Sequence, residues 1–294
     1  MFVATLVAEG ALGQGEVDGA ASGLSAAGFA PADPVWIEAG SAADIGFDGD
    51  MGAARALLQS LPGGFDVVVQ PRATRAKKLI VADMDSTMIT VECIDELADY
   101  AGIKAQVADV TERAMRGELD FAQALTARVA LLKGLADEVI DQCRTERVVI
   151  MPGAKALVQT MRARGAEAIL VSGGFTRFTG PVAQEIGFNA NVANVLGIEG
   201  GMLSGEVAFP IVDAARKRTE LDAAIARLGI DRAESLAVGD GANDIPMIEG
   251  AGLGVAYHGK QKLRAAADAE INHGDLRVLL YAQGLPKADW ATQD

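Results

Sequence analysis

The chain has 294 residues, half of them apolar, and a formal net charge of −14 from 26 basic and 40 acidic side chains. This length and apolar content exclude a disordered tail and a small disulfide-stapled protein, and they predict one large domain or two ordinary ones. The acidic field, with no basic cluster strong enough to overcome it, excludes nucleic acid and anionic lipid as partners. Only two cysteines are present, Cys93 and Cys143, so we expect a reducing compartment.

Targeting and membrane segments are not expected. The first basic residue is Arg55, so no charged segment precedes the apolar start and a signal peptide is not predicted. Apolar runs stay far below the roughly 20 residues that a membrane-spanning helix needs. We therefore expect a cytoplasmic protein without a membrane partner, for which a homodimer is one option.

The first part of the chain differs from the rest in charge. Residues 1–54 hold eight acids and no Lys or Arg, and basic residues then gather after Pro71, which predicts a domain boundary near residue 74. Apolar patterns predict strands at 2–8, 35–39 and 65–70 and helices at 17–27 and 51–61, with an irregular stretch before the second helix that has room for one more strand. This order suits a small ferredoxin-like α+β domain, with no candidate catalytic group in it.

The rest of the chain shows a different rhythm. Short continuous apolar runs predict buried strands at 79–82, 169–171, 236–238 and 253–256. Helical patterns lie between strands; Pro152 and Gly165 bracket one helix, and Gly229 ends another. The alternation predicts an α/β, doubly wound parallel sheet. Residues 92–145 are helical in pattern and too long for one crossover, which indicates an inserted helical cap, and 197–209 read as a hairpin.

Candidate catalytic residues follow three of these strands. Asp83 and Asp85 are two residues apart, so their side chains point to the same side while the strand continues. The second strand runs into Ser172-Gly173-Gly174, where a hydroxyl beside N–H groups at a helix start would suit an anion. The third runs into Gly239-Asp240-Gly241-Ala242-Asn243-Asp244, which suits a hard cation. Alone, each could be an acidic loop, a glycine turn or a helix cap. Together, at the carboxyl edge of one sheet, they predict Mg²⁺-assisted phosphoryl transfer through an aspartate.

These motifs resemble a known group of enzymes. Asp83-Met84-Asp85-Ser86-Thr87 and the two glycine-containing loops are similar to the motifs of the haloacid dehalogenase (HAD) superfamily. Within it, the segments 92–98 and 114–132 resemble the phosphoserine phosphatases. The resemblance covers about residues 75–285, in five motifs in order. It implies a HAD-type core at 75–294 with the cap at about 91–148, while the element order of residues 1–74 resembles an ACT-like domain, with a regulatory role open.

The resemblance implies a role for each matching residue. Asp83 would be the nucleophile and a Mg²⁺ ligand, and Asp85 the general acid and base, whose main-chain carbonyl also binds the metal. Asp240 would be the third ligand. Asp244 and Gly174 would support the site. The residues that would hold the phosphoryl group are Ser172, Gly173, Lys217 and Asn243. Glu92 and Arg128 would bind the amino and carboxylate groups of serine.

Some of these assignments have support of their own. Phe121, Leu125, Arg128 and Leu132 are spaced to share one helix face, so Arg128 either meets a buried acceptor or reaches out at the edge of the stripe. Lys217 is one of three neighbouring cations with Arg216 and Arg218, and its selection rests on the resemblance. We interpret Cys93 and Cys143 as packing residues, and His258 as a surface-loop residue near the pocket rim.

The reaction implied is the Mg²⁺-dependent hydrolysis of O-phospho-L-serine, the last step of serine biosynthesis. One alternative is another small-molecule phosphatase or phosphotransferase, acting on phosphothreonine or homoserine, with the same core motifs but a different cap. A second is an amino-acid sensor with vestigial catalysis. The presence of Asp83, Asp85, Asp240 and Lys217 argues against the sensor.

Overall fold

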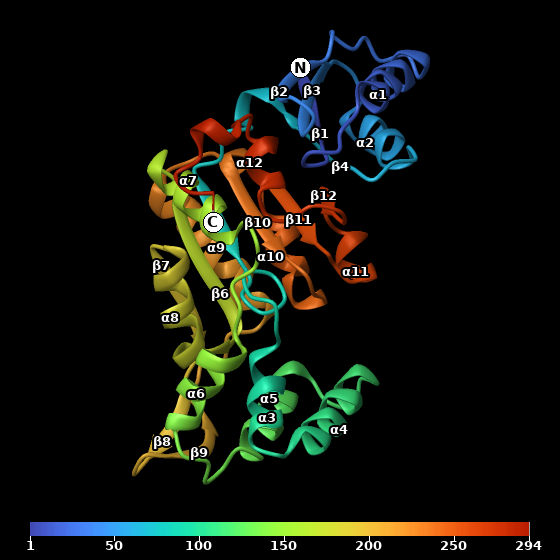
Figure 1. Ribbon diagram of the computed structural model, residues 1–294. Coiled ribbons are helices and arrows are strands. Elements are labelled where there is room, and N and C mark those ends of the chain that lie inside the picture. Colours follow the sequence, from blue (N-terminus) through green and yellow to red (C-terminus); the bar gives the residue numbers. More distant parts are fainter. Residues whose placement is uncertain (294) are drawn as a thin grey trace.

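The computed structural model describes residues 1–293, apart from the side chain of Met115. Ten strands form one continuous sheet in the order β2-β3-β1-β4-β12-β11-β10-β5-β6-β7. Figure 1 shows the N-terminal elements in blue at one end of the molecule and the helices α3, α4 and α5 in green at the other, with the strands β5, β6, β10 and β11 between them.

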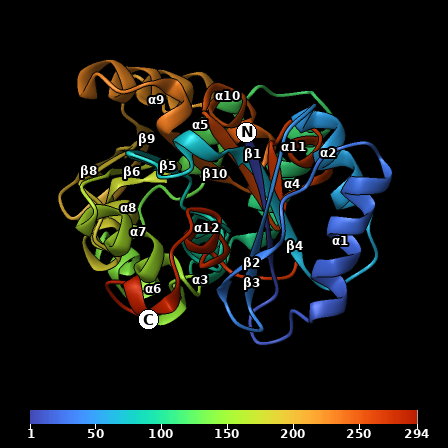
Figure 2. The same cartoon turned by 90° about the horizontal axis from the view of Figure 1, so that it is seen from above.

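The N-terminal quarter of the chain forms the antiparallel part of the sheet, with two helices. Its strands are β1 (Phe2–Val7), β2 (Val35–Glu38), β3 (Ala42–Phe47) and β4 (Asp66–Pro71), and its helices are α1 (Gln14–Ala26) and α2 (Met51–Gln59). Figure 2 shows both helices on the outer side of these strands. The strand β3 fills the stretch expected to be mostly irregular. The charged Asp44 interrupts the apolar pattern of this strand in the sequence. In the structure the Thr5 hydroxyl and the Arg75 guanidinium donate hydrogen bonds to the Asp44 carboxylate.

The larger part contains a parallel sheet. Its strands are β5 (Leu79–Ala82), β6 (Glu167–Phe175), β7 (Ala190–Asn194), β10 (Ser235–Gly239), β11 (Leu253–Tyr257) and β12 (Ala269–Ile271). Its helices are α7 (Ala154–Ala163), α8 (Thr176–Ile186), α9 (Ala214–Leu228), α10 (Ile245–Gly250), α11 (Gln261–Arg264) and α12 (Val278–Ala282). All neighbouring pairs within these six strands are parallel, which confirms the predicted doubly wound sheet.

The first core strand shows why this sheet is covered on both faces. Ile80 and Ala82 pack into one hydrophobic cluster with residues of α7 and α8, whereas Leu79 and Val81 pack into another with residues of α9 and α10. All four side chains are fully buried, so alternation of polar and apolar residues is absent from this strand. The chain order reverses between β5 and β10, where open α/β sheets place their ligands.

A group of helices is inserted between β5 and β6. These are α3 (Cys93–Tyr100), α4 (Lys104–Met115), α5 (Phe121–Ala130) and α6 (Glu138–Arg147). The hairpin of β8 (Leu196–Glu199) and β9 (Met202–Val207) lies beside them, since the Gly134 N–H donates to the Leu203 carbonyl at 2.8 Å. Short 3-10 turns complete the chain: η1 (Arg72–Thr74), η2 (Arg232–Glu234), η3 (Ala242–Asp244) and η4 (Lys287–Asp289).

The antiparallel and parallel parts of the sheet join through β4 and β12. Glu270 pairs with Val67 in antiparallel register, and the buried Asp66 carboxylate accepts the backbone N–H groups of residues 272, 273 and 274 at 2.7–3.1 Å. Arg75 contacts Asp44 on one side and donates to the Ala282 carbonyl on the other. Among the helices of residues 1–293, none combines the length and apolar character that crossing a bilayer would require.

Lys77, just before β5, gives a testable pH dependence of stability. Its side chain is 5% exposed, and Nζ donates to the Ala233 carbonyl at 2.8 Å. Burial lowers the pKa of this ammonium from 10.5 to about 8. Between these values the unfolded chain keeps a proton that the folded chain has lost, so the free energy of unfolding rises with pH. Relative to Lys77→Met, wild type should gain about 2 kcal/mol between pH 7 and pH 10.

Urea unfolding at both pH values measures this gain. Lys78→Met is the matched control, because it removes the neighbouring lysine, whose side chain is 58% exposed. A constant difference between wild type and Lys77→Met across the range would show that Lys77 keeps its proton on folding.

Candidate active site

The strand ends and the helical insertion enclose a cavity of about 350 Å³. Acidic, basic and apolar side chains all reach it, from the core on one side and from α3, α4 and α5 on the other. Its lining residues are Asp83, Asp85, Glu92, Ile94, Thr111, Phe121, Leu125, Arg128, Gly173, Gly174, Phe175, Asp240, Asn243 and Lys260. Most of the site residues that the sequence predicts are therefore brought together, although Ser172, Lys217 and Asp244 lie behind this lining.

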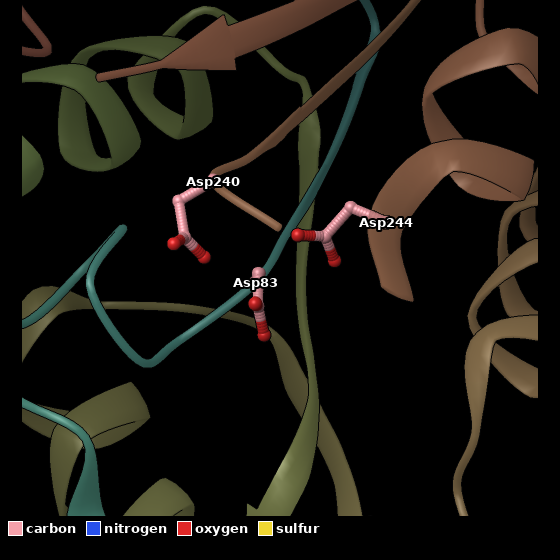
Figure 3. Close-up of side chains that lie close together, drawn as sticks. All are labelled: Asp83, Asp240 and Asp244. Carbon is pink, nitrogen blue, oxygen red and sulfur yellow. The ribbon is translucent and has the colours of Figure 1, made fainter. Parts of the chain in front are cut away.

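Three carboxylates meet at the point where β5 and β10 end. Asp83 follows β5, Asp240 follows β10, and Asp244 closes the turn η3; each offers an oxygen within 4.8 Å of the others. Figure 3 shows these three side chains converging. All three residues are buried, and burial of several carboxylates together is costly unless cations accompany them.

Lys217 is the first of these cations. Its side chain is 1% exposed, and Nζ lies 2.6 Å from Asp83 Oδ1 and 2.7 Å from Asp244 Oδ1. Burial opposes its charge, but the two carboxylates outweigh this effect and raise the pKa of the ammonium. Asp244 also caps the turn, because its Oδ2 accepts the Gly241 N–H at 3.1 Å. Lys217 thus couples Asp83 to the loop that carries Asp240.

The neighbours of Lys217 do not reach the cavity. Arg216 pairs with Glu220, and Arg218 with Asp222 at 2.7 Å, both one turn along the same helix. Helix α9 begins after Asp213, which caps it by accepting the Arg216 N–H. This start turns Lys217, rather than either arginine, toward the core.

Asp83 and Asp85 both have raised pKa values. For Asp83 the main cause is burial, followed by the nearby Asp244, with Lys217 acting in the opposite direction. Burial and then Glu92 raise the pKa of Asp85 to about 7. Asp85 Oδ1 accepts the backbone N–H of Cys93 at 3.2 Å, at the start of α3. Met84, between the two aspartates, is fully buried.

The loop after the second strand lies close to these carboxylates. Ser172 is fully buried and its Oγ accepts the Gly174 N–H at 2.9 Å. The expectation of a hydroxyl at a helix start is wrong, because β6 continues to Phe175 before α8 begins. A Cβ at Gly174 would lie 3.1 Å from Asp85 Oδ2, and one at Gly173 would lie 3.1 Å from the Phe121 ring. At both positions a Cβ would therefore make a tight contact, and neither glycine has a positive φ.

The helical insertion contributes one carboxylate and one guanidinium group to the cavity. Glu92 precedes α3, and the Ser86 hydroxyl donates to its Oε1 at 3.0 Å; burial raises the pKa of Glu92. Arg128 lies on α5, and burial lowers the pKa of its guanidinium. Within residues 1–293 no carboxylate forms an ion pair with Arg128, whose Nε only approaches the Ala124 carbonyl at 3.4 Å. It is a cation ready to receive an anion.

Part of the predicted helix face is confirmed. Phe121, Leu125 and Arg128 line the cavity from α5, whereas Leu132 lies beyond the end of that helix and packs in the core. Cys93 and Cys143 are buried, and burial raises the pKa of both thiols, so they pack rather than react. His258 is exposed, with its ring near the Gly274 carbonyl, outside the cavity lining.

Lys260 is a site residue that the sequence analysis missed. Its Nζ lies 2.9 Å from Asp240 Oδ2. Lys260 follows a predicted strand, as the three motifs do, and this position is the signal in the sequence that could have identified it as a site residue. Phe175, Ile94 and Thr111 also line the cavity and carry no motif that would identify them.

The match to a family model identifies the broad class of protein to which the chain belongs. Residues 80–249 match the haloacid dehalogenase-like hydrolase model, which spans β5, the helical insertion and η3. The chain belongs to this family.

Relatives and solved structures agree with this family membership. The phosphoserine phosphatase of Albidiferax ferrireducens is 48% identical over 208 residues, covering 69% of this chain and 88% of that protein. The probable phosphoserine phosphatase of Vibrio cholerae superposes with a TM-score of 0.77 at 34% identity, over 96% of this chain and 86% of that one. A HAD family hydrolase of Salmonella enterica gives 0.83 at 28% identity, over 96% and 98%.

Proposed function

We propose that the chain is a phosphoserine phosphatase, which hydrolyses O-phospho-L-serine to L-serine and phosphate in the last step of L-serine biosynthesis. The observation that carries this proposal is the pairing of a buried Asp83–Lys217–Asp244 cluster with a cap that presents Glu92 and Arg128 to the same cavity. The first set suits phosphoryl transfer, and the second suits the ammonium and carboxylate of an amino acid.

The reaction proceeds in two displacements. An Asp83 carboxylate oxygen attacks phosphorus, the bond to the serine oxygen breaks, and Asp85 donates its proton to that oxygen. Water then attacks the aspartyl-phosphate, Asp85 takes the proton that the water loses, and the bond from Asp83 to phosphorus breaks. A carboxyl with a pKa of about 7 is suited to giving and accepting the proton in turn.

The donor set of the site fits Mg²⁺. Five carboxylates lie here with three cations, which leaves two negative charges in excess when all are ionised: Asp83, Asp85, Glu92, Asp240 and Asp244 against Lys217, Lys260 and Arg128. Asp83, Asp240 and the main-chain carbonyl of Asp85 would hold the ion, with Asp244 in support. A bound Mg²⁺ offsets the charge of the phosphoryl oxygens.

The remaining polar groups bind the substrate. Ser172, the Gly173 N–H, Lys217 and Asn243 hold the phosphoryl oxygens, and Gly174 lets the loop approach Asp85. Glu92 receives the ammonium and Arg128 the carboxylate of serine. This zwitterion binding favours phosphoserine over phosphate esters without an amino acid.

Phosphate release from O-phospho-L-serine and from p-nitrophenyl phosphate, each with Mg²⁺ and with EDTA, tests the proposal. We expect Mg²⁺-dependent turnover that strongly prefers phosphoserine over the aryl ester. Hydrolysis of the aryl ester alone would keep the chemistry and refute the assigned substrate. Failure with both esters would favour the sensor alternative.

Arg128→Ala should separate binding of the amino acid from the chemistry. Two charge-assisted N–H bonds to the carboxylate would be lost, so kcat/KM for phosphoserine should fall by about 100-fold or more, while p-nitrophenyl phosphate is affected by less than about 3-fold. Arg128→Lys keeps the charge without the fork and should be intermediate.

Arg147→Ala is the matched control, since Arg147 pairs with Glu96 on the surface of the same group of helices. An equal loss with both substrates in Arg128→Ala would mean that Arg128 supports the fold of the cap instead of the substrate.

We propose in addition that residues 1–74 form an ACT-like domain of their own with a regulatory role. They have a separate hydrophobic cluster that includes Ala4, Leu24, Ile45 and Val69. None of the residues that line the catalytic cavity lies in this segment. The segment therefore acts on catalysis only through the core.

A further inference from the structure

Lys260 is bound twice to one residue, Asp240. Its Nζ lies 2.9 Å from Asp240 Oδ2, and its backbone N–H donates to the Asp240 main-chain carbonyl at 2.9 Å. The loop after β11 is thereby joined to the loop after β10 at the residue that we assign as a metal ligand. The proposed catalytic roles make no use of this lysine.

The backbone of Lys260 is held in place from its other side. Lys260 is the N-cap residue of α11, and its carbonyl accepts the N–H groups of Leu263 and Arg264 at 2.9 and 3.1 Å. The ammonium thus approaches Asp240 from a backbone that is held by hydrogen bonds on both sides.

The two partners differ sharply in exposure. The Lys260 side chain is 67% exposed, whereas that of Asp240 is 10% exposed. An ion pair with a solvated lysine adds little to folding stability, so stability does not account for the contact. The contact instead affects the Asp240 carboxylate, because Lys260 occupies Oδ2 and leaves Oδ1 for a further ligand.

We propose that Lys260 is a positioning residue that holds Asp240 Oδ2 from the solvent side and so directs Oδ1 toward the cation shared with Asp83. The inference rests on the proposed Mg²⁺ site. Hydrogen-bonded partners of ligating carboxylates orient the ligand, and their loss costs about 10- to 100-fold in metal affinity. A lysine that instead competed with the cation for Asp240 would weaken metal binding, and its removal would strengthen it.

Mn²⁺ binding measures the two cases directly. Free Mn²⁺ is followed by electron paramagnetic resonance during titration of wild type, Lys260→Met, Lys260→Arg, Lys262→Met and Asp240→Asn, without substrate. We expect Lys260→Met to bind Mn²⁺ about 10- to 100-fold more weakly and Lys260→Arg to recover most of the affinity. Lys262→Met, which removes an exposed lysine from the same short helix, should match wild type.

Kinetics provide the second readout. In Lys260→Met the Mg²⁺ concentration for half-maximal phosphate release should rise by the same factor, while kcat at saturating Mg²⁺ stays within about 3-fold of wild type. The melting temperature without metal should be unchanged, which a merely structural role would not predict.

The outcomes separate the inference from the function beneath it. Equal or tighter Mn²⁺ binding by Lys260→Met, with none by Asp240→Asn, would overturn the role of Lys260 and leave the metal site intact. Equal binding by wild type and Asp240→Asn would overturn both.

Discussion

Asp83→Asn should abolish phosphate release from O-phospho-L-serine, with a loss of at least about 10⁴-fold in kcat. An amide is a poor nucleophile and cannot form the aspartyl-phosphate, whereas Asp240 and Lys217 would remain in place. Asn is close to Asp in volume and still offers an oxygen to Lys217, so the variant should fold. Phosphate release and circular dichroism of the same preparation check both points.

Trapping the intermediate distinguishes the nucleophile from a residue that only binds metal. Acid quenching after incubation with ³²P-labelled substrate should leave label on wild type and none on Asp83→Asn. Asp85→Asn is the informative comparison. A p-nitrophenolate leaving group needs no proton, so this variant should accumulate label from p-nitrophenyl phosphate because the hydrolysis step lacks its base. Label on Asp83→Asn would assign the nucleophile to another side chain.

Lys217→Met should damage both stability and catalysis. Removing the ammonium leaves Asp83 and Asp244 buried without the cation that contacts both at 2.6 and 2.7 Å. Breaking a buried pair by removing one partner costs about 3–5 kcal/mol. Loss of the charge beside the phosphoryl group should lower kcat by about 10³-fold. Urea unfolding without Mg²⁺ and phosphate release with Mg²⁺ measure the two losses.

Two kinds of control make this prediction specific. Arg216→Ala and Arg218→Ala remove neighbouring cations whose ion pairs are partly exposed, so each should cost less than about 1 kcal/mol. The double variant Lys217→Met with Asp244→Asn removes opposite charges together and should regain part of the stability without regaining activity. Similar losses of stability in all three single variants would mean that the contact with the buried carboxylates does not set Lys217 apart from its neighbours.

The positions of the carboxylates that we assign to catalysis could be predicted, because both the chemistry and the topology restrict the residues that follow the strands. Buried parallel strands read as short apolar runs, and their carboxyl ends meet at one edge, so polar residues that follow such runs converge. Asp83, Asp85 and Asp240 confirm this by lining one cavity. The strands β7 and β12 gave no comparable signal, since Asn interrupts the apolar pattern of β7 and Glu that of β12.

The selection among similar residues could not be made in this way. Arg216, Lys217 and Arg218 all carry a positive charge, so the sequence does not distinguish them. Only the start of α9 after Asp213 turns Lys217 inward. Lys260 looks like any surface lysine until the loops after β10 and β11 lie side by side. The sequence predicts that the strand ends before Ser172 and that a helix start or a glycine turn follows, whereas β6 continues through Ser172 to Phe175.

The sequence by itself determined the α/β class, the helical insertion and the aspartates that we assign to the reaction, because burial and reactivity restrict the residue types allowed at each position. Only the tertiary structure decided the ion pairs of the site and the junction of the antiparallel and parallel parts of the sheet. Lys217 reaches Asp83 across 134 positions of the chain, and Asp66 binds the backbone more than 200 positions away. Contacts of this kind depend on packing distance and direction, which no local pattern of residues records.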